Sequence, residues 1–316
     1  SQLHDAILSM DKFSNSLPVA IASIGSTKTT LLVGSAITVG ADVTIPDNII
    51  LWFVGPGKFF VNATYTVTIN SPSQVLAHTQ QQVFDGTGTI TFTNGGVVSP
   101  GWWGFSSGGT AATNADAYNA CSNSLSAKGG AIIIPPTGSA HQVDDTLTHP
   151  AKPISVVGAH PDLCIIESTA TASLAHGFTF TRSHHLRNLT IRTSASLASN
   201  YDMYAVRMNL DGVTVSGGNQ SVKWESLKVR GFNNSLYVDG GDAYNIDRLS
   251  FTDLDLQCSG PASTYIGSCL YVNRVTQVYG THSQFDQNST GEHAIYCFGS
   301  KNVVFDGFKI RNADKG

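Results

Sequence analysis

The stretch that decides the fold reads VKWESLKV at residues 222–229 and recurs as LSFTDLDL at residues 249–256. Three more segments, 184–191, 278–285 and 303–310, align with these two, and the first, third, sixth and eighth positions are mostly apolar. The starts at 184, 222, 249, 278 and 303 lie 38, 27, 29 and 25 residues apart, a spacing typical of a solenoid of short strands. The change from odd to even apolar positions predicts a bend between positions three and six, because an unbent strand alternates strictly.

A second column of short strands follows the first, at residues 206–209, 236–239, 270–273 and 295–298. Aligning these strands predicts two outward-facing rows of side chains, Arg207–Tyr237–Tyr271–Tyr296 and Asn209–Asp239–Asn273–Phe298. Two columns with one period indicate the stacked coils of a β-helix, since a propeller blade needs four strands in about forty residues. In this register we expect an interior made of Trp224, Phe251, Leu254, Phe305, Leu236 and Leu270, with Lys228 and Tyr271 outside.

Composition narrows the class of protein. The chain has 316 residues, long enough to bury a large core, and only 13% of them are charged. Few charges with abundant glycine favour an extracellular all-β scaffold over a cytosolic α/β enzyme. A net charge of −4 without a basic run argues against nucleic acid, and no apolar stretch is long enough to predict membrane insertion. The chain starts at Ser1 without a signal peptide, which we interpret as a fragment or processed product.

The five cysteines and the motifs predict no metal site and no cofactor. None of the cysteines forms a CxxC pair, and P-loop and GxGxxG patterns are absent. Cys297 occupies an inward strand position and is expected to be a small buried apolar residue. Cys258 and Cys269 flank one loop, so they are either a disulfide pair or two free thiols.

Three segments follow from the pattern. Residues 1–18 place Leu3, Ile7 and Met10 at helical spacing, which predicts a short N-terminal helix or linker. Residues 19–105 alternate short β patterns with turn signals and predict a β-rich module, either a small solenoid or a sandwich. Residues 106–316 form the predicted β-helix. The last residues follow a complete strand directly, so we expect further coils, and part of the catalytic site, beyond this sequence.

The junction between the last two segments carries a family resemblance. Trp103-Gly104-Phe105 is followed by an expected helix from about Asn114, with Tyr118, Cys121 and Leu125 on one face. Gly129-Gly130, the strand 131–134 and the turn Pro135-Pro136-Thr137-Gly138 come next. This succession resembles the entry into the β-helix of the pectate-lyase superfamily, found in phage tailspikes and secreted polysaccharide-degrading enzymes. The family's acidic stretch before the helix is replaced here by residues 106–110, SSGGT.

The resemblance implies a right-handed single-stranded parallel β-helix, with a β-rich N-terminal module and a short capping α-helix. It also implies a homotrimer, as in tailspikes.

Candidate catalytic residues are the outward carboxylates of the coils. Glu225 and Asp255 could pair across the bend, and Asp239 and Asp242 could pair within one loop. Adjacent coils lie about 4.8 Å apart, so such pairs could reach the carboxylate separations that glycosidases use. The alternative for each is an ordinary solvated side chain, and Lys228 beside Asp255 is explained as a surface ion pair.

Candidate substrate-binding residues are Tyr237, Tyr271, Tyr296, Arg207 and Asn273. Flat rings with a polar tip suit the apolar faces of sugars, but a tyrosine row also fits a packed ladder or a subunit interface. His184 is expected in the core, and neither it nor His282 has the carboxylate spacing of a metal site.

These features lead to a first hypothesis, a phage tailspike that binds and depolymerises a bacterial surface polysaccharide, capsule or O-antigen. Its location is then the virion tail or the extracellular space. The alternatives are a non-catalytic glycan-binding or structural β-helix, and a secreted bacterial polysaccharide lyase. Hydrolysis needs an acid and a second carboxylate, whereas elimination needs a base that works near neutral pH. Arg207 with the tyrosines suits elimination, and the carboxylates suit hydrolysis.

Overall fold

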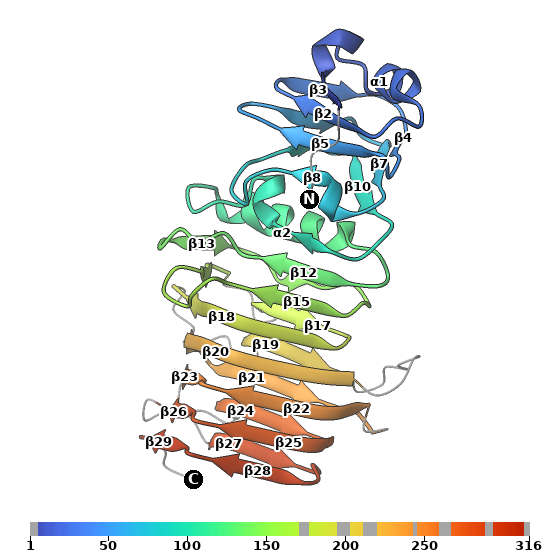
Figure 1. The fold of residues 1–316 in the computed structure, drawn as a ribbon. Helices are drawn as coiled ribbons and strands as arrows, with labels where there is room; N and C mark the ends of the chain where they lie inside the picture. The colour runs from blue at the N-terminus through green and yellow to red at the C-terminus, as the bar shows by residue number, and fades with distance from the viewer. Residues whose placement is uncertain are drawn as a thin grey trace. The chain divides into compact units, whose positions relative to one another are not determined.

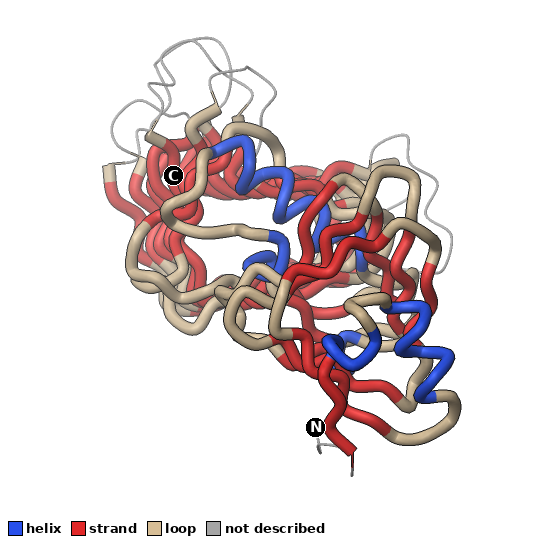
Figure 2. Tube along the Cα trace, turned by 90° about the horizontal axis from the view of Figure 1, so that it is seen from above, coloured by secondary structure: helices blue, strands red, loops and turns tan. Residues whose placement is uncertain are grey.

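A computed structural model describes residues 6–170, 177–194, 203–210, 220–242, 245–258, 267–287 and 293–312. These residues are mostly strand, with two α-helices among them, α1 (Leu17–Ile24) and α2 (Ala111–Ser124) (Figures 1 and 2). The chain divides into two compact units. The first comprises Ser1–Ser106 and Asp116–Pro135, and the second comprises Ser107–Ala115 and Pro136–Gly316.

The first unit is built of short parallel strands in which each turn of the chain adds one strand to each of three sheets. The first sheet has the order β1 (Ala6–Ser9), β2 (Thr29–Val33), β5 (Ile49–Phe53), β8 (Val75–Leu76). The second is β3 (Ala36–Val39), β6 (Lys58–Val61), β9 (Phe84–Gly86), and the third is β4 (Val43–Ile45), β7 (Thr66–Ile69), β10 (Thr89–Phe92). A further pair joins β11 (Val97–Val98) to β12 (Gly130–Ile133). Parallel pairing throughout favours the solenoid interpretation of this module over a sandwich, whose sheets are antiparallel.

The helix predicted within residues 1–18 is wrong. Residues 6–9 form strand β1, Met10–Phe13 form a 3-10 helix, and α1 begins only at Leu17. Pro18 lies in the first turn of α1, where the missing N–H costs nothing. Leu3 lies outside the described residues.

The second unit repeats the three-sheet pattern with longer strands (Figure 1). One sheet follows the order β15 (Ile154–Val157), β18 (His184–Thr193), β20 (Gln220–Phe232), β22 (Ile246–Thr252), β25 (Val275–Thr281), β28 (Val303–Asp306). The next is β14 (Leu147–Thr148), β17 (Phe178–Phe180), β19 (Tyr204–Asn209), β21 (Asn234–Asp239), β24 (Ser268–Asn273), β27 (His293–Phe298). The third side consists of β13 (Ala140–Val143), β16 (Ile165–Ser168), the distal halves of β18 and β20, β23 (Asp255–Cys258), β26 (Gln284–Asp286), β29 (Lys309–Arg311). This arrangement is compatible with a parallel β-helix.

Both strand registers read from the sequence are confirmed. Trp224 pairs with Leu186 on one side and Phe251 on the other, and Val229 pairs with Ile191 and Leu256. In the second column, Tyr237 pairs with Arg207 and Tyr271.

The bend between positions three and six is also confirmed, and it has one cause. The fifth position of every repeat has a positive φ: Asn188 58°, Ser226 49°, Asp253 51°, His282 46° and Gly307 65°. A residue in the left-handed region turns the strand, so that the eight-residue repeat serves two sides of each coil.

Burial of the inward positions follows the predicted pattern in the coils that have neighbours on both sides. Asp239 and Asn273 correct the outward row, because both are buried and hydrogen-bonded to each other. Trp224, Leu236 and Leu270 are fully buried, and Phe251 and Leu254 nearly so. Phe305 is only half-buried, and Cys297 is exposed, which corrects the expectation that this thiol is buried. Both belong to the last described coil, where β27 and β28 are the final strands of their sheets and nothing described stacks beyond them.

The helix α2 confirms the expected face, since Tyr118, Cys121 and Leu125 are all buried. Burial raises the pKa of Tyr118 and of the Cys121 thiol well above their usual values, so both are neutral packing groups. Within the described part of the chain, no helix has the length and apolar character needed to span a membrane.

Candidate functional site

The tyrosine row forms a ladder whose rings cover one another. Tyr237 stacks on Tyr271 with centroids 4.6 Å apart, and Tyr271 on Tyr296 at 5.0 Å, while Tyr204 packs edge-on against Tyr237 at 4.9 Å. The guanidinium of Arg207 lies 5.8 Å from the centre of the Tyr204 ring. Because the ring faces of Tyr237 and Tyr271 are occupied by their neighbours, a sugar would meet ring edges and hydroxyls here rather than the stacking surfaces that the sequence suggested.

The electrostatics of the ladder do not favour a tyrosine base. Burial raises the pKa of Tyr237 well above its usual value, and the nearby Asp239 and Tyr271 add to the shift. Burial, followed by the Asp239 charge, raises the pKa of Tyr271 as well. Both phenols therefore keep their protons at neutral pH, whereas elimination needs a base that gives up its proton there.

Asp239 is the last residue of β21, two positions after Tyr237, and its side chain accepts a backbone hydrogen bond. Asp239 is 6% exposed, and its carboxylate accepts hydrogen bonds from Asn273 Nδ2 at 3.0 Å, the Gly241 N–H at 2.9 Å and the Tyr237 hydroxyl at 3.4 Å. Asp242 is exposed and pairs with Arg274 at 2.9 Å. Three donors on one buried carboxylate describe a group that fixes a turn and the row beside it. Catalysis by Asp239 or Asp242 stays a prediction.

Glu225 belongs to a separate cluster. Its two carboxylate oxygens contact His185 Nε2 at 2.7 Å and Lys223 Nζ at 2.6 Å. Partial burial raises the pKa of Glu225, but the hydrogen bonds from Lys223 and His185 outweigh it and lower the pKa overall. Glu225 is thus held ionised, which fits a base or a charge partner and not a proton donor.

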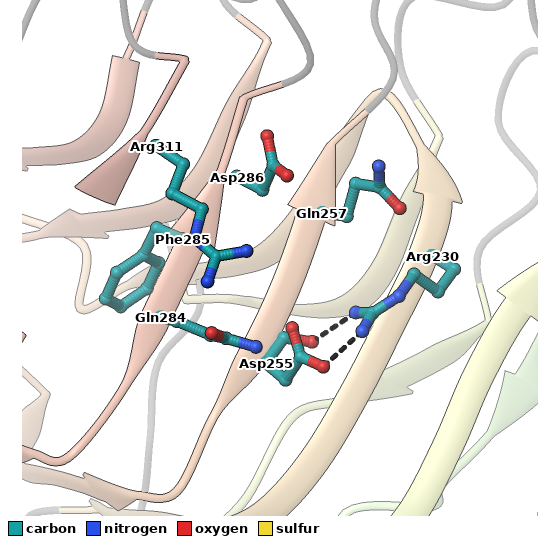
Figure 3. A pocket seen from close by; sticks show the side chains of 7 residues that line it. All are labelled: Arg230, Asp255, Gln257, Gln284, Phe285, Asp286 and Arg311. Atoms are coloured by element: carbon teal, nitrogen blue, oxygen red, sulfur yellow. Dashed lines mark hydrogen bonds and ion pairs between the residues drawn. The ribbon is translucent and has the colours of Figure 1, made fainter. Parts of the chain in front are cut away.

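Asp255 lines a pocket of about 120 Å³ on the third side of the coils (Figure 3). The pocket is formed by Arg230, Asp255, Gln257, Gln284, Phe285, Asp286 and Arg311. Arg230 makes an ion pair with the Asp255 carboxylate and also donates to the Asp255 carbonyl oxygen at 2.7 Å. Asp286 accepts a hydrogen bond from Asn312 Nδ2 at 2.9 Å. Two carboxylates and two guanidinium groups therefore converge on one small hollow.

A second, more open hollow of about 410 Å³ adjoins the first. Asp255 and Gln284 line both, and the second adds Asp253, His282 and Lys309 among others. Both hollows are lined by residues of β23, β26 and β29, and we call the two together the groove. Among the described residues, no group of three or more His, Cys, Asp or Glu side chains is placed to hold a metal ion.

The expected ion pair between Lys228 and Asp255 is wrong, although the two residues pair in the strand register. Lys228 reaches Asp162 instead, at 2.6 Å, and Asp255 is taken by Arg230. The structure records no contact that joins Glu225 to Asp255 across the bend among the interactions of its described residues. Each of the two has partners of its own.

Sequence reasoning found Asp255 but missed the rest of the pocket. Arg230, Gln257, Asp286 and Arg311 all lie at a ninth position, one residue beyond the eight that were aligned. Extending the repeat by one residue gives the polar row Arg192, Arg230, Gln257, Asp286, Arg311, which was a visible signal. Positions seven and nine face the same side because position eight points inward.

No protein-family model matches the chain, and no curated protein or solved structure shows significant similarity to it.

Proposed function

We propose that the chain is a right-handed single-stranded parallel β-helix of the phage tailspike type, which binds and hydrolyses a bacterial surface polysaccharide in the groove around Asp255. The observation that carries the proposal is the pair Asp255 and Asp286, two carboxylates on neighbouring strands in a hollow that also holds Arg230 and Arg311. A groove that continues along the coils suits an extended polymer. The location that goes with this function is the virion tail.

The spacing of the pair supports hydrolysis. Asp255 pairs in register with Gln284, so Asp286 is offset by one strand and two residues. With about 4.8 Å between strands and about 3.3 Å per residue, the two Cα atoms are roughly 8 Å apart. Inverting glycosidases hold their carboxyl groups about 6.5–9.5 Å apart, which leaves room for the attacking water. Two aspartates on one face with this Cα separation can place their carboxyl groups within that range. Elimination, and with it the secreted lyase, has less support because the ladder tyrosines hold their protons.

A second candidate is glycan binding without cleavage. It is favoured by the contacts of the pair itself, since Arg230 is paired with Asp255 and Asn312 donates to Asp286. A carboxylate that already has a hydrogen-bonding partner can hold a glycan as well as it can act in catalysis.

The test compares Asp255→Asn and Asp286→Asn with Asp306→Asn, an exposed carboxylate outside both hollows. A panel of purified capsule and O-antigen polysaccharides is incubated with each protein, and new reducing ends and the absorbance of unsaturated sugars are followed. We expect reducing ends from the parent and from Asp306→Asn, and a loss of about 10²–10⁴-fold in the two groove variants with binding retained. Unsaturated products would establish a lyase instead. Binding by the parent without any cleavage would leave the second candidate.

A further inference from the structure

Two buried thiols lie against each other beneath the proposed groove. Cys258 ends β23 and Cys269 lies in β24, and both side chains are fully buried. Their sulfur atoms are 2.9 Å apart. Even non-bonded carbon atoms, which are smaller than sulfur, prefer about 3.5–4.0 Å, so this approach is closer than packing alone favours.

The fold brings the two residues together on neighbouring sides of one coil. Cys258 is in register with Phe232, and the next strand column begins at Ser268, one residue before Cys269. Only ten residues, 259–268, lie between the two positions and close the loop. The strand pairing, and not the loop itself, therefore holds the two free thiols close to each other.

We propose that Cys258 and Cys269 form an intramolecular disulfide that fastens the floor of the groove. Cys258 directly follows Gln257, which lines the pocket, and the carbonyl oxygen of Asp286 lies 3.4 Å from the Cys269 sulfur. The disulfide would therefore join β23, the strand that carries Gln257, to Cys269 in β24, whose sulfur contacts the backbone of Asp286. This inference concerns a covalent modification and does not depend on the proposed hydrolysis.

The oxidant is a small disulfide such as oxidised glutathione. The thiolate of one cysteine attacks a sulfur of oxidised glutathione, forms a mixed disulfide and releases one glutathione thiolate. The second cysteine, as thiolate, then attacks the protein sulfur of the mixed disulfide, forms the Cys258–Cys269 bond and releases the second glutathione. The protein loses two electrons and two protons, and oxidised glutathione becomes two molecules of the thiol.

The bond forms while the chain folds, before the pair is covered. In the folded chain, the hydrogen bond with Cys258 and burial together raise the pKa of the Cys269 thiol, so little reactive thiolate is present.

The test starts from reduced, unfolded protein that is refolded in a mixture of reduced and oxidised glutathione. The product is unfolded without reductant, alkylated with iodoacetamide and mapped by peptide mass spectrometry. We expect modification of Cys121, Cys164 and Cys297 only, and a linked peptide pair that contains Cys258 and Cys269. The same sample reduced before alkylation is expected to carry the label on all five cysteines. Full alkylation of Cys258 and Cys269 in the unreduced sample would overturn the proposal, and this measurement needs no variant.

A second readout is the melting temperature with and without reductant. We expect reduction to lower the Tm of the parent by several degrees, because closing even a short loop stabilises the folded state. The exposed Cys297→Ser variant is expected to show the same sensitivity, and Cys258→Ala with Cys269→Ala to show none. A parent Tm that is unchanged by a reductant shown to reach the pair would contradict a stabilising bridge.

Discussion

At the scale of single residues, the coils depend on one conformation at the fifth position of the repeat. Four of the five residues there, Asn188, Ser226, Asp253 and His282, are not glycine, yet all have a positive φ. Asn, Asp and His tolerate this region better than other residues that carry a Cβ. Ser226 is the exception in type, which makes it a useful probe of the bend.

We predict that Ser226→Val destabilises the protein by about 1–2 kcal/mol, because a β-branched side chain is poorly tolerated at positive φ. Ser226→Gly is expected to be neutral or slightly stabilising. Ser221→Val is the matched control, since this exposed residue lies on the same strand without a positive φ and valine favours strands. Urea unfolding measures the three changes. Equal effects of the two valine substitutions would show that φ at position 226 carries no cost.

His184 makes a second prediction at this scale. It is buried, stacks on Phe180 at 3.9 Å and accepts a hydrogen bond from Trp224 Nε1 at 3.1 Å. Its role as a satisfied core residue was predicted from its inward position. Burial lowers the pKa of His184 from 6.5 to about 3, and the pKa of the buried His149 falls to about 3 for the same reason.

The pKa shift of His184 fixes the sign of a pH effect. Between about pH 6.5 and 3 the unfolded chain binds a proton that folded His184 refuses, so its contribution to stability is present above pH 6.5 and is lost as the pH falls. The slope is at most about 1.4 kcal/mol per pH unit for each such histidine.

We predict that His184→Gln, which keeps an acceptor for Trp224, makes the free energy of unfolding fall less steeply between pH 7 and 5. Urea titrations at several pH values measure this, and identical slopes for parent and His184→Gln would refute it.

At the scale of elements, the tyrosine ladder is expected to stabilise the coils. We predict a coupling of about 0.5–1.5 kcal/mol between Tyr237→Leu and Tyr271→Leu in a double-mutant cycle, because the two rings stack. The control cycle pairs Tyr237→Leu with Tyr279→Leu, an exposed tyrosine on the strand β25 of another sheet, and should be additive. Chemical denaturation gives the free energies. Additivity in both cycles would leave the ladder free for the sugar-binding role that the sequence suggested.

The strand columns could be predicted from sequence because each position has a repeated requirement. Inward positions in neighbouring coils contact each other, so Trp224 and Phe251 had to align. The apolar positions had to change from odd to even wherever a residue with positive φ turns the strand. The pattern failed at the N-terminus, where Ile7 and Met10 satisfy a strand followed by a 3-10 helix as readily as one α-helix. The spacing of the apolar residues at the N-terminus occurs only once, so no aligned repeat could distinguish the two structures.

The candidate site was only partly predictable. Asp255 stood out as an outward carboxylate, but its partner Arg230 lies at the ninth position, outside the aligned repeat. The ion pair of Lys228 with Asp162 spans 66 residues and joins no two repeat positions, so no register could reveal it. Side-chain choice among several nearby charges depends on rotamers and solvent, which a strand pattern does not encode.

At the scale of the whole molecule, the remaining proposal is assembly. The tailspike type implies a homotrimer, and a chain with only 13% charged residues offers little repulsion against association. From a chain mass of 33.4 kDa, we predict a species of three times that mass, about 100 kDa, in light scattering. Asp255→Asn should keep this mass, because a groove residue is not required for assembly.

The double variant Tyr237→Ala, Tyr271→Ala then shows whether the tyrosine ladder is a subunit contact or part of the glycan site. Loss of the trimer with normal glycan binding would make the ladder a subunit contact, and a retained trimer with weakened binding would make it part of the glycan site. A parent that stays at 33.4 kDa at tens of micromolar would remove the trimer and favour a secreted monomeric enzyme.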